Sequence, residues 1–244
     1  MAGVWDDLST WWIDAVRDDP TQSDDLLDLL SELVPGTGGT TIDVGCGEGQ
    51  AMRLLGPPIV GIDASESLLR RASHSGPVVR ALLPDLSWVR PRSFDRAICV
   101  GVLDLIEDDA ALLTNLATVV RPGGHLLVVV NHPVATAPRS EPLVDAEGEV
   151  LWRWGSYLEA GDFDQRIEGH HVTLRHRPLA RLLTSAAASG WILESMIERG
   201  PSPAALDRFP GYRGQQHIPT LLGVRWTRRT TLASSGTPAS GYGP

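Results

Sequence analysis

The 244-residue sequence predicts an α/β fold in which helices wind around a mostly parallel sheet. Two observations support this prediction. Short apolar runs alternate with segments of helical periodicity between residues 38 and 131, and the first run, Thr40-Thr41-Ile42-Asp43-Val44, ends in a glycine-rich turn that opens a helix. Such alternation is typical of strand–helix–strand units, whose right-handed crossovers make neighbouring strands parallel.

The first 38 residues predict a helical cap. Apolar residues recur there at steps of three and four, which places them along one helical face. These residues are Trp5, Leu8, Trp11, Trp12 and Val16. A second amphipathic helix is expected to begin after Ser23, its N-cap, and to run to Leu33 before Pro35-Gly36 ends it.

The next segments predict the core of the domain. The expected strands are 40–45, 58–62, 77–82, 94–101 and 124–131, and the expected helices are 48–55, 65–74 and 108–120. Residues 132–177 break this rhythm, because they are rich in Trp, His, Pro and Gly and show neither a clean helix nor a simple series of strands. A loop of this length inside a compact domain is typically functional, so we interpret it as an insertion that covers the substrate.

One helix (178–189) and two strands (191–198 and 217–227) complete the prediction. Residues 1–229 are expected to form a single domain. It consists of the cap (1–38), a cofactor-binding core (39–131), the insertion (132–177) and a C-terminal core (178–229). The tail 230–244, dominated by Ser, Gly, Pro and Ala, is predicted to be disordered.

The composition excludes several classes of function. A net charge of −9 argues against a nucleic-acid partner, because such proteins usually present a basic face. The absence of a long apolar run and of a basic, apolar leader predicts a cytoplasmic protein with no membrane partner. All 21 basic residues are arginines, so no lysine can form a Schiff base or act as a base. Cys46 and Cys99 lack the spacing of a disulfide framework and are expected to be small buried residues.

The glycine-rich turn predicts a nucleotide-type cofactor. Gly45 and Gly47 allow a sharp turn and a close approach of a ligand to the backbone, while the next helix presents free N–H groups. Asp63 ends the second strand, where its carboxylate could accept hydrogen bonds from two ribose hydroxyls. This acid serves a dinucleotide or S-adenosylmethionine equally well.

The arrangement Asp43-x-Gly45-x-Gly47-x-Gly49 resembles motif I of class I S-adenosylmethionine-dependent methyltransferases. Two later segments strengthen the resemblance. Residues 94–100 (Phe-Asp-Arg-Ala-Ile-Cys-Val) resemble the fourth strand of that family, and Arg121-Pro122-Gly123-Gly124 resembles the turn before its fifth strand. The resemblance implies a Rossmann-like sheet of seven strands whose last two form an antiparallel hairpin at the edge, with S-adenosyl-L-methionine as cofactor.

Shorter segments resemble an actinobacterial group of small-molecule methyltransferases. They are Trp11-Trp12, Asn131-His132-Pro133, Trp152-Arg153-Trp154 and His176-Arg177-Pro178-Leu179. Membership of such a group implies the type of reaction but not the acceptor.

Ligands of open α/β sheets lie beyond the carboxyl ends of the strands, which assembles the candidate cofactor-binding residues. They are Asp43, Gly45, Cys46, Gly47, Asp63, Ala64, Leu82, Leu83, Val100 and Gly101. By resemblance, the glycine loop faces the methionine part, Asp63 the ribose and Leu83 the adenine. Asp43 could equally hold the turn without touching the ligand. Many family members carry an acid after the third strand, where this chain has Ala81-Leu82-Leu83 with Asp85 displaced.

Two residues are candidates for a catalytic base, which methyl transfer needs only if the acceptor must lose a proton. His132 follows the fifth strand, whose end borders the expected methyl position; alternatively it shapes the turn before Pro133. Asp104 follows the fourth strand and could equally begin a helix. His170, His171 and His176 lack the acids or cysteines of a usual ligand set, so no metal is predicted.

Aromatic residues of the cap and the insertion are candidates for binding the acceptor. They are Trp5, Trp11, Trp12, Trp152, Trp154 and Tyr157. At least two of them are expected to line the pocket, although packing of the cap onto the sheet is the simpler explanation for each. The sequence thus predicts methyl transfer to a small molecule held between the cap and the insertion. The alternatives are a protein that binds S-adenosylmethionine without transferring methyl, and a nucleotide-dependent oxidoreductase, which the Gly45/Gly47/Gly49 spacing opposes.

Overall fold

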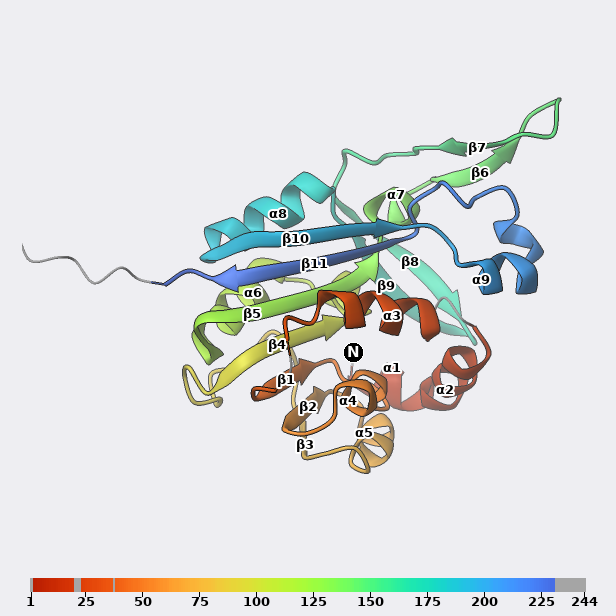
Figure 1. Ribbon diagram of the computed structural model, residues 1–244. Helices are drawn as coiled ribbons and strands as arrows, with labels where there is room; N and C mark the ends of the chain where they lie inside the picture. The colour runs from red at the N-terminus through yellow and green to blue at the C-terminus, as the bar shows by residue number, and fades with distance from the viewer. Residues whose placement is uncertain (1, 20–22, 37, 231–244) are drawn as a thin grey trace, which may run out of the picture.

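The computed structural model describes residues 2–19, 23–36 and 38–230 of the chain. A seven-stranded sheet in the spatial order β10-β11-β5-β4-β1-β2-β3 forms its centre (Figure 1). The strands are β1 (Thr41–Val44), β2 (Ile59–Asp63), β3 (Val78–Arg80), β4 (Phe94–Val100), β5 (Val120–Asn131), β10 (Trp191–Arg199) and β11 (Leu221–Arg228).

The strand pairing confirms the predicted doubly wound sheet. Strands β3, β2, β1, β4 and β5 pair in parallel, whereas β11 pairs antiparallel with both β5 and β10. The chain lays β2 and β3 on one side of β1 and then returns to place β4 on the other side. The strand order therefore reverses between β1 and β4, the point at which open α/β sheets bind their ligands.

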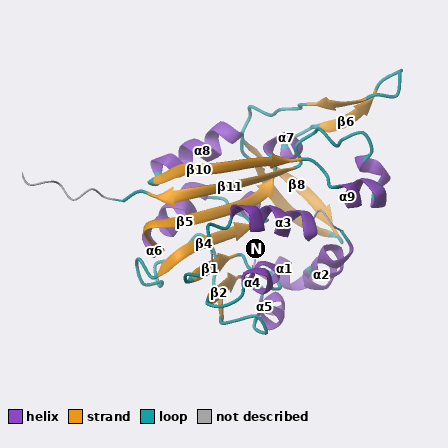
Figure 2. Ribbon diagram, in the orientation of Figure 1, coloured by secondary structure: helices purple, strands orange, loops and turns teal. Residues whose placement is uncertain are grey.

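Helices cover both faces of the sheet, which explains the apolar character of its strands (Figure 2). On one face α6 (Asp109–Val119) and α8 (Leu179–Ala188) contact each other and the strands β5 and β10. On the other face lie α3 (Asp24–Leu33), α4 (Gln50–Leu55) and α5 (Glu66–Ala72). Every residue of β1 is buried, as a strand covered on both sides requires.

The N-terminal cap contains two helices before α3 where the sequence predicted one. Helix α1 (Ala2–Asp7) and helix α2 (Ser9–Asp18) flank Leu8, whose side chain is buried. The side chain of Val16 lies outside the part of the chain that can be described. The expected N-cap at Ser23 is wrong in its chemistry: its hydroxyl donates to the carbonyl of Asp19, at 3.2 Å, and makes no capping bond to α3.

The cap is anchored to the core at two points. In α1, Asp6 Oδ1 accepts hydrogen bonds from the Ser65 hydroxyl at 2.7 Å and from the backbone N–H of Ser67 at 3.0 Å, at the start of α5. Helix α3 packs closely on β11, where a Cβ on Gly223 would lie 2.8 Å from Leu29 Cγ. These contacts bring the tryptophans of the cap over the carboxyl ends of the central strands.

The insertion contains regular structure that the sequence did not predict. After the short helix α7 (Pro133–Thr136), two antiparallel hairpins follow, β6–β7 (Glu141–Val144 and Val150–Arg153) and β8–β9 (Gly161–Ile167 and His170–His176). Figure 1 shows β6–β7 projecting from the body, while β8–β9 lies behind α3. The hairpin β8–β9 is joined by Glu168 and Gly169, both at positive φ, as a two-residue turn requires.

Several other bounds differ from the prediction. Strand β5 begins at Val120 and β11 at Leu221, and the helix α9 (Pro203–Arg208) and the 3₁₀ turns η2 (Leu103–Leu105) and η3 (Pro210–Tyr212) were not expected. Ser202 caps α9 by accepting from Ala205 N, at 3.2 Å. Among the helices that can be described, none is long and apolar enough to cross a membrane. The predicted disordered tail falls, from residue 231 onward, outside the described residues.

Candidate functional site

A cavity of about 420 Å³ opens at the point where the strand order reverses. Most of the predicted cofactor-binding residues line it. They are Gly45, Gly47, Asp63, Ala64, Leu82, Leu83, Val100 and Gly101. Asp43 and Cys46 instead line a smaller cavity of about 50 Å³, whose wall also includes Gly45 and Gly47.

The glycine loop is tied to the end of β2 by its own backbone. The N–H groups of Gly45 and Cys46 both donate to the carbonyl of Ile62, at 2.7 and 2.9 Å. The next N–H, of Gly47, donates to Asp63 Oδ2 at 2.9 Å. The loop is therefore held in a fixed shape before any ligand arrives.

Each glycine of the loop is required for a different reason. All three have positive φ, at +74°, +53° and +92° for Gly45, Gly47 and Gly49. A Cβ on Gly45 would lie 2.3 Å from Val102 Cγ2, and one on Gly49 would lie 2.9 Å from the Cα of Ala72. A Cβ on Gly47 would meet only Trp12 Nε1, at an ordinary 3.7 Å, because this position opens into the cavity.

Asp63 is positioned to hold a polyhydroxyl group. Its Oδ1 accepts from Ser65 N at 2.8 Å and its Oδ2 from Gly47 N, so the backbone fixes the orientation of the carboxylate. Each oxygen keeps one further lone pair. Burial raises the pKa of Asp63, while hydrogen bonds from the backbone N–H groups of Ser65, Gly47 and Ala64 oppose the rise. These features fit a ribose whose hydroxyls donate to both oxygens.

One carboxyl oxygen of Asp43 has no hydrogen-bond partner among the described residues. The side chain of Asp43 is buried, and the oxygen in question is Oδ2. Burial, with a smaller contribution from Asp63, raises the pKa of Asp43 to about 8. An orphaned carboxylate oxygen is costly unless a ligand satisfies it. The residue therefore fits a cofactor that brings a cationic or N–H group to the glycine loop.

Asp104 lies in η2 on the cavity wall, beside Asn131 at the end of β5. Burial raises the pKa of Asp104 to about 7, against the opposing effects of the Arg177 charge and a hydrogen bond from the Asn131 side chain. A carboxyl group of this pKa can exchange a proton near neutral pH. Among the predicted catalytic residues, it is the one that faces the cavity.

Two buried arginines hold the loop that carries Asp104. Arg177 donates to the carbonyls of Leu103, Ile106 and Glu107, and its Nε lies 3.0 Å from Asp109 Oδ1. Arg175 donates to the carbonyl of Leu105, at 3.1 Å. Arg175 belongs to β9 and Arg177 follows it directly. These hydrogen bonds therefore connect the second hairpin to the Asp104 loop.

His132 lies outside the cavity lining, with both ring nitrogens engaged. Its Nδ1 accepts from Val134 N at 3.1 Å, so Nε2 carries the proton and donates to Glu198 Oε1 at 2.8 Å. Burial lowers the pKa of His132 below its ordinary value, although Glu198 opposes this. Of the two interpretations that the sequence left open, this geometry favours the turn residue; its role as a base stays a prediction.

Replacement of His132 by alanine is expected to lower the thermal stability, because Val134 N–H loses its acceptor inside the protein, at a cost of about 1–3 kcal/mol. Since the folded pKa is depressed, the stability contributed by neutral His132 is present above about pH 6.5 and lost as the pH falls. Thermal unfolding of wild type and His132→Ala between pH 5 and 8 measures both effects. Turnover that drops while stability holds would instead support the base.

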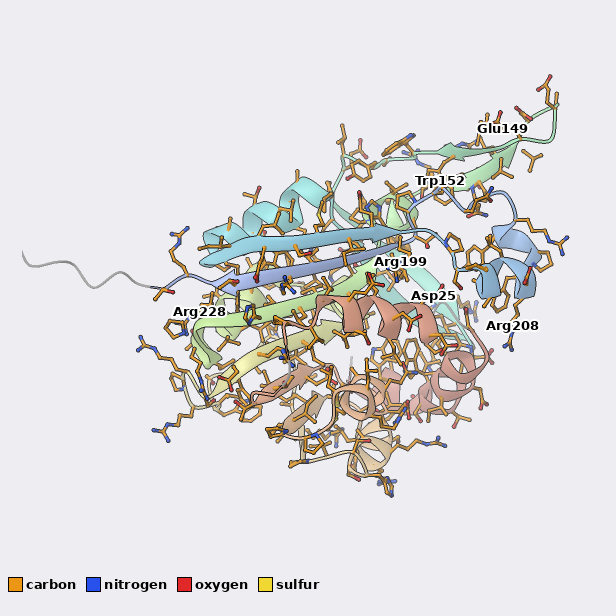
Figure 3. All side chains as sticks on the ribbon, in the orientation of Figure 1. Asp25, Glu149, Trp152, Arg199, Arg208 and Arg228 are labelled. Atoms are coloured by element: carbon orange, nitrogen blue, oxygen red, sulfur yellow. The ribbon has the colours of Figure 1, made fainter. Side chains whose placement is uncertain are left out.

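The aromatic candidates divide into two groups. Trp5, Trp11 and Trp12 line the cavity, with the Trp5 and Trp12 rings edge to face at 5.9 Å. The three aromatics of the insertion do not line it. Trp152 Nε1 donates to the carbonyl of Val134, and Figure 3 shows Trp152 on the β6–β7 hairpin, beyond the β10–β11 pair from the cap.

Tyr157 and Trp154 pack away from the cavity as well. Their rings pack edge to face with 5.5 Å between the ring centroids, and the centroid of the Tyr157 ring lies 5.8 Å from that of the His176 ring. His176 Nε2 lies 2.8 Å from the carbonyl of Tyr157, and its Nδ1 lies 3.1 Å from the Thr136 hydroxyl. This cluster supports the base of the insertion.

The residues that line the cavity but were not predicted come mainly from η2 and from the second hairpin. They include Leu105, Ile106, Asn131, Ile167, Val172 and Leu174. The signal for the hairpin was weak: Gly169 suits the positive φ of a tight turn, but the Glu168 before it is not a residue that such turns favour. Asp85 does not line the cavity; it caps Ser87 N at 2.9 Å.

Comparisons with known proteins agree with this site. Residues 17–186 match the model of a family described as a methyltransferase domain. The structure of an S-adenosylmethionine-dependent methyltransferase from Mesorhizobium loti is similar, with a TM-score of 0.71 and 29% identity over 82% of this chain and 96% of that one.

Two curated relatives are similar over the cofactor region. The ubiquinone biosynthesis O-methyltransferase of Ralstonia nicotianae is 35% identical over 121 residues, 46% of this chain and 51% of that protein. The trans-aconitate 2-methyltransferase of an Azoarcus species is 33% identical over 107 residues, 41% and 42% of the two chains. This chain spans about half the length of the curated relatives it matches. Because the family match covers well over half of the chain, the protein belongs to the S-adenosylmethionine-dependent methyltransferases.

Proposed function

We propose that the protein transfers a methyl group from S-adenosylmethionine to a small molecule held between the N-terminal cap and the β8–β9 hairpin. The observation that supports this most is the continuity of the cavity. One wall is the glycine loop with Asp63, and the same space continues past Asp104 to Leu174 of the hairpin. A donor and an acceptor bound in one continuous cavity can meet without a further rearrangement.

The donor end of the cavity fits the cofactor by its own chemistry. Gly47 leaves room for a ligand against the backbone, and Asp63 offers two carboxylate oxygens. In the adjoining smaller cavity, Asp43 has an oxygen with no hydrogen-bond donor among the described residues. When bound, S-adenosylmethionine supplies a methyl group made electrophilic by a positively charged sulfur. The chain has only to orient the two partners and exclude water.

Asp104 is the residue we propose as base. A general base is most effective when its pKa lies near the working pH, and the pKa of Asp104 is about 7. Asp104 also lines the cavity that is proposed to hold the acceptor. Arg177 and Asn131 oppose the rise that burial causes in the pKa of Asp104. His132 is the alternative base; it would first have to release Val134 N–H.

The test is turnover with a labelled methyl group. Purified protein is incubated with methyl-labelled S-adenosylmethionine and a fractionated metabolite extract, and label in small molecules is followed. Transfer that depends on the protein supports the proposal. Tight binding of the cofactor in calorimetry without transfer to any fraction would favour a protein that only binds S-adenosylmethionine.

Replacement of Asp63 by alanine is expected to weaken cofactor affinity by about 1.5–3 kcal/mol, the scale of hydrogen bonds to a charged group. The variant also frees the N–H groups of Gly47 and Ser65, so the loop loses part of its support. Calorimetry measures the affinity, and Asp63→Asn serves as the matched variant because it keeps an acceptor oxygen. An affinity of Asp63→Ala within error of wild type would move the ribose elsewhere.

A further inference from the structure

Among the described residues, the charged groups on the cavity wall are all acids. Among the described lining residues these are Asp19, Asp63 and Asp104, and no arginine or histidine accompanies them. Arg177, the guanidinium whose charge acts on Asp104, is engaged by backbone carbonyls and Asp109. Arg175 is likewise directed at the carbonyl of Leu105. The cavity therefore offers an anion no basic side chain from the part of the chain that can be described.

This charge pattern sets the chemistry of the acceptor. A buried anion is stable only when a cation or several donors pair with it. A carboxylate placed beside Asp104 would meet repulsion instead. A tricarboxylic acceptor, as the name of the Azoarcus relative implies for that protein, does not fit this wall. A cationic group does fit it, because Asp104, the lining acid that is not assigned to the cofactor's ribose and lies beside Asn131, would stabilise its charge.

The rest of the wall favours an apolar body with one cationic end. Indole rings of Trp5, Trp11 and Trp12 line the side formed by the cap, and Ile167, Val172 and Leu174 line the side formed by the hairpin. The faces of indole rings attract cations as well as apolar groups. Asp104 and Asn131, which are joined by a side-chain hydrogen bond, line the same cavity.

Building on the proposed function, we propose that the acceptor is an apolar amine, whose ammonium group is recognised by Asp104 and Asn131. The ammonium gives one proton to the Asp104 carboxylate and becomes a neutral amine. The nitrogen lone pair then forms the bond to the methyl carbon, while the electron pair of the sulfur–methyl bond returns to the sulfur. The positive charge passes from sulfur to nitrogen, and Asp104 later releases its proton to water.

The test compares three ligands of one skeleton. The protein is saturated with S-adenosylhomocysteine, and calorimetry measures the binding of 2-phenylethylamine, 2-phenylethanol and 3-phenylpropanoate. We expect the amine to bind at least about tenfold more tightly than the alcohol, and the carboxylate to bind most weakly. In Asp104→Asn the preference for the amine over the alcohol is expected to vanish. Asp164→Asn, an equal change of charge on the exposed face of β8, is expected to retain it.

The outcomes separate this proposal from the one on which it rests. If the alcohol or the carboxylate binds as tightly as the amine or more tightly, the amine proposal is overturned. It is also overturned if none of the three ligands binds to protein that does bind S-adenosylhomocysteine. Neither result bears on the proposed methyl transfer. A preference unchanged in Asp104→Asn would also overturn the amine proposal. Failure to bind S-adenosylhomocysteine would overturn the methyltransferase proposal itself, and the amine with it.

Discussion

Replacement of Gly47 by alanine is expected to abolish cofactor binding while the protein stays folded. The added methyl group meets no protein atom closer than Trp12 Nε1 at 3.7 Å, so it projects into the space where the cofactor would approach the backbone. The left-handed conformation of residue 47, at φ +53°, adds a strain of about 1–2 kcal/mol. We expect the affinity for S-adenosylmethionine, measured by calorimetry, to fall at least about 100-fold.

Alanine variants of two other glycines separate the effect of backbone strain from the effect of blocking the cavity. Gly56 ends α4 with φ +67° and has nothing within 4 Å of an added Cβ, so Gly56→Ala imposes the backbone strain outside the cavity. Because the ψ of residue 56 is 177°, in a region essentially confined to glycine, this variant is expected to lower the unfolding temperature and to leave cofactor affinity unchanged. In Gly45→Ala the methyl group would collide with Val102, so that variant is expected to be the least stable of the three. Equal cofactor affinities of Gly47→Ala and Gly56→Ala would contradict the assignment of the loop.

Replacement of Asp104 by asparagine is expected to reduce the turnover number by about 10²- to 10⁴-fold, the usual contribution of a positioned base. Asparagine keeps the size of the side chain and can still hydrogen-bond to Asn131, but it cannot accept the proton of the acceptor. The Asp104 loop keeps its support, because Arg177 binds backbone carbonyls of that loop. Turnover with an identified acceptor is the measurement, and cofactor affinity is the control that should not change.

The pH dependence distinguishes a base from a structural role. Burial raises the pKa of Asp104 to about 7, so the active carboxylate accumulates as the pH rises through 7 and disappears below it. Wild-type turnover should therefore fall on the acid side of neutrality, and this limb should be absent from Asp104→Asn. If the limb persists in the variant, another group is titrating, and His132 becomes the first alternative.

The sheet and the glycine loop could be predicted because their signals are local. A strand covered on both faces is buried throughout, as β1 is, and the apolar residues Ile42 and Val44 were its local signal. The three glycines of the loop have positive φ, which few other residues adopt without cost. The second hairpin left only a weak local signal, Gly169, because the Glu168 that precedes it is not a residue that favours a positive φ.

The sequence by itself determined the class of fold, the family and the glycine turn that we propose binds the cofactor, because each rests on residues close together in the chain. Only the tertiary structure decided which side chains share the cavity. His132 is turned to Glu198, 66 residues away, and Arg177 reaches the carbonyl of Leu103 across 74 residues to hold the Asp104 loop. The direction of a side chain at the end of a strand depends on such distant partners, and no pattern of neighbouring residues records them.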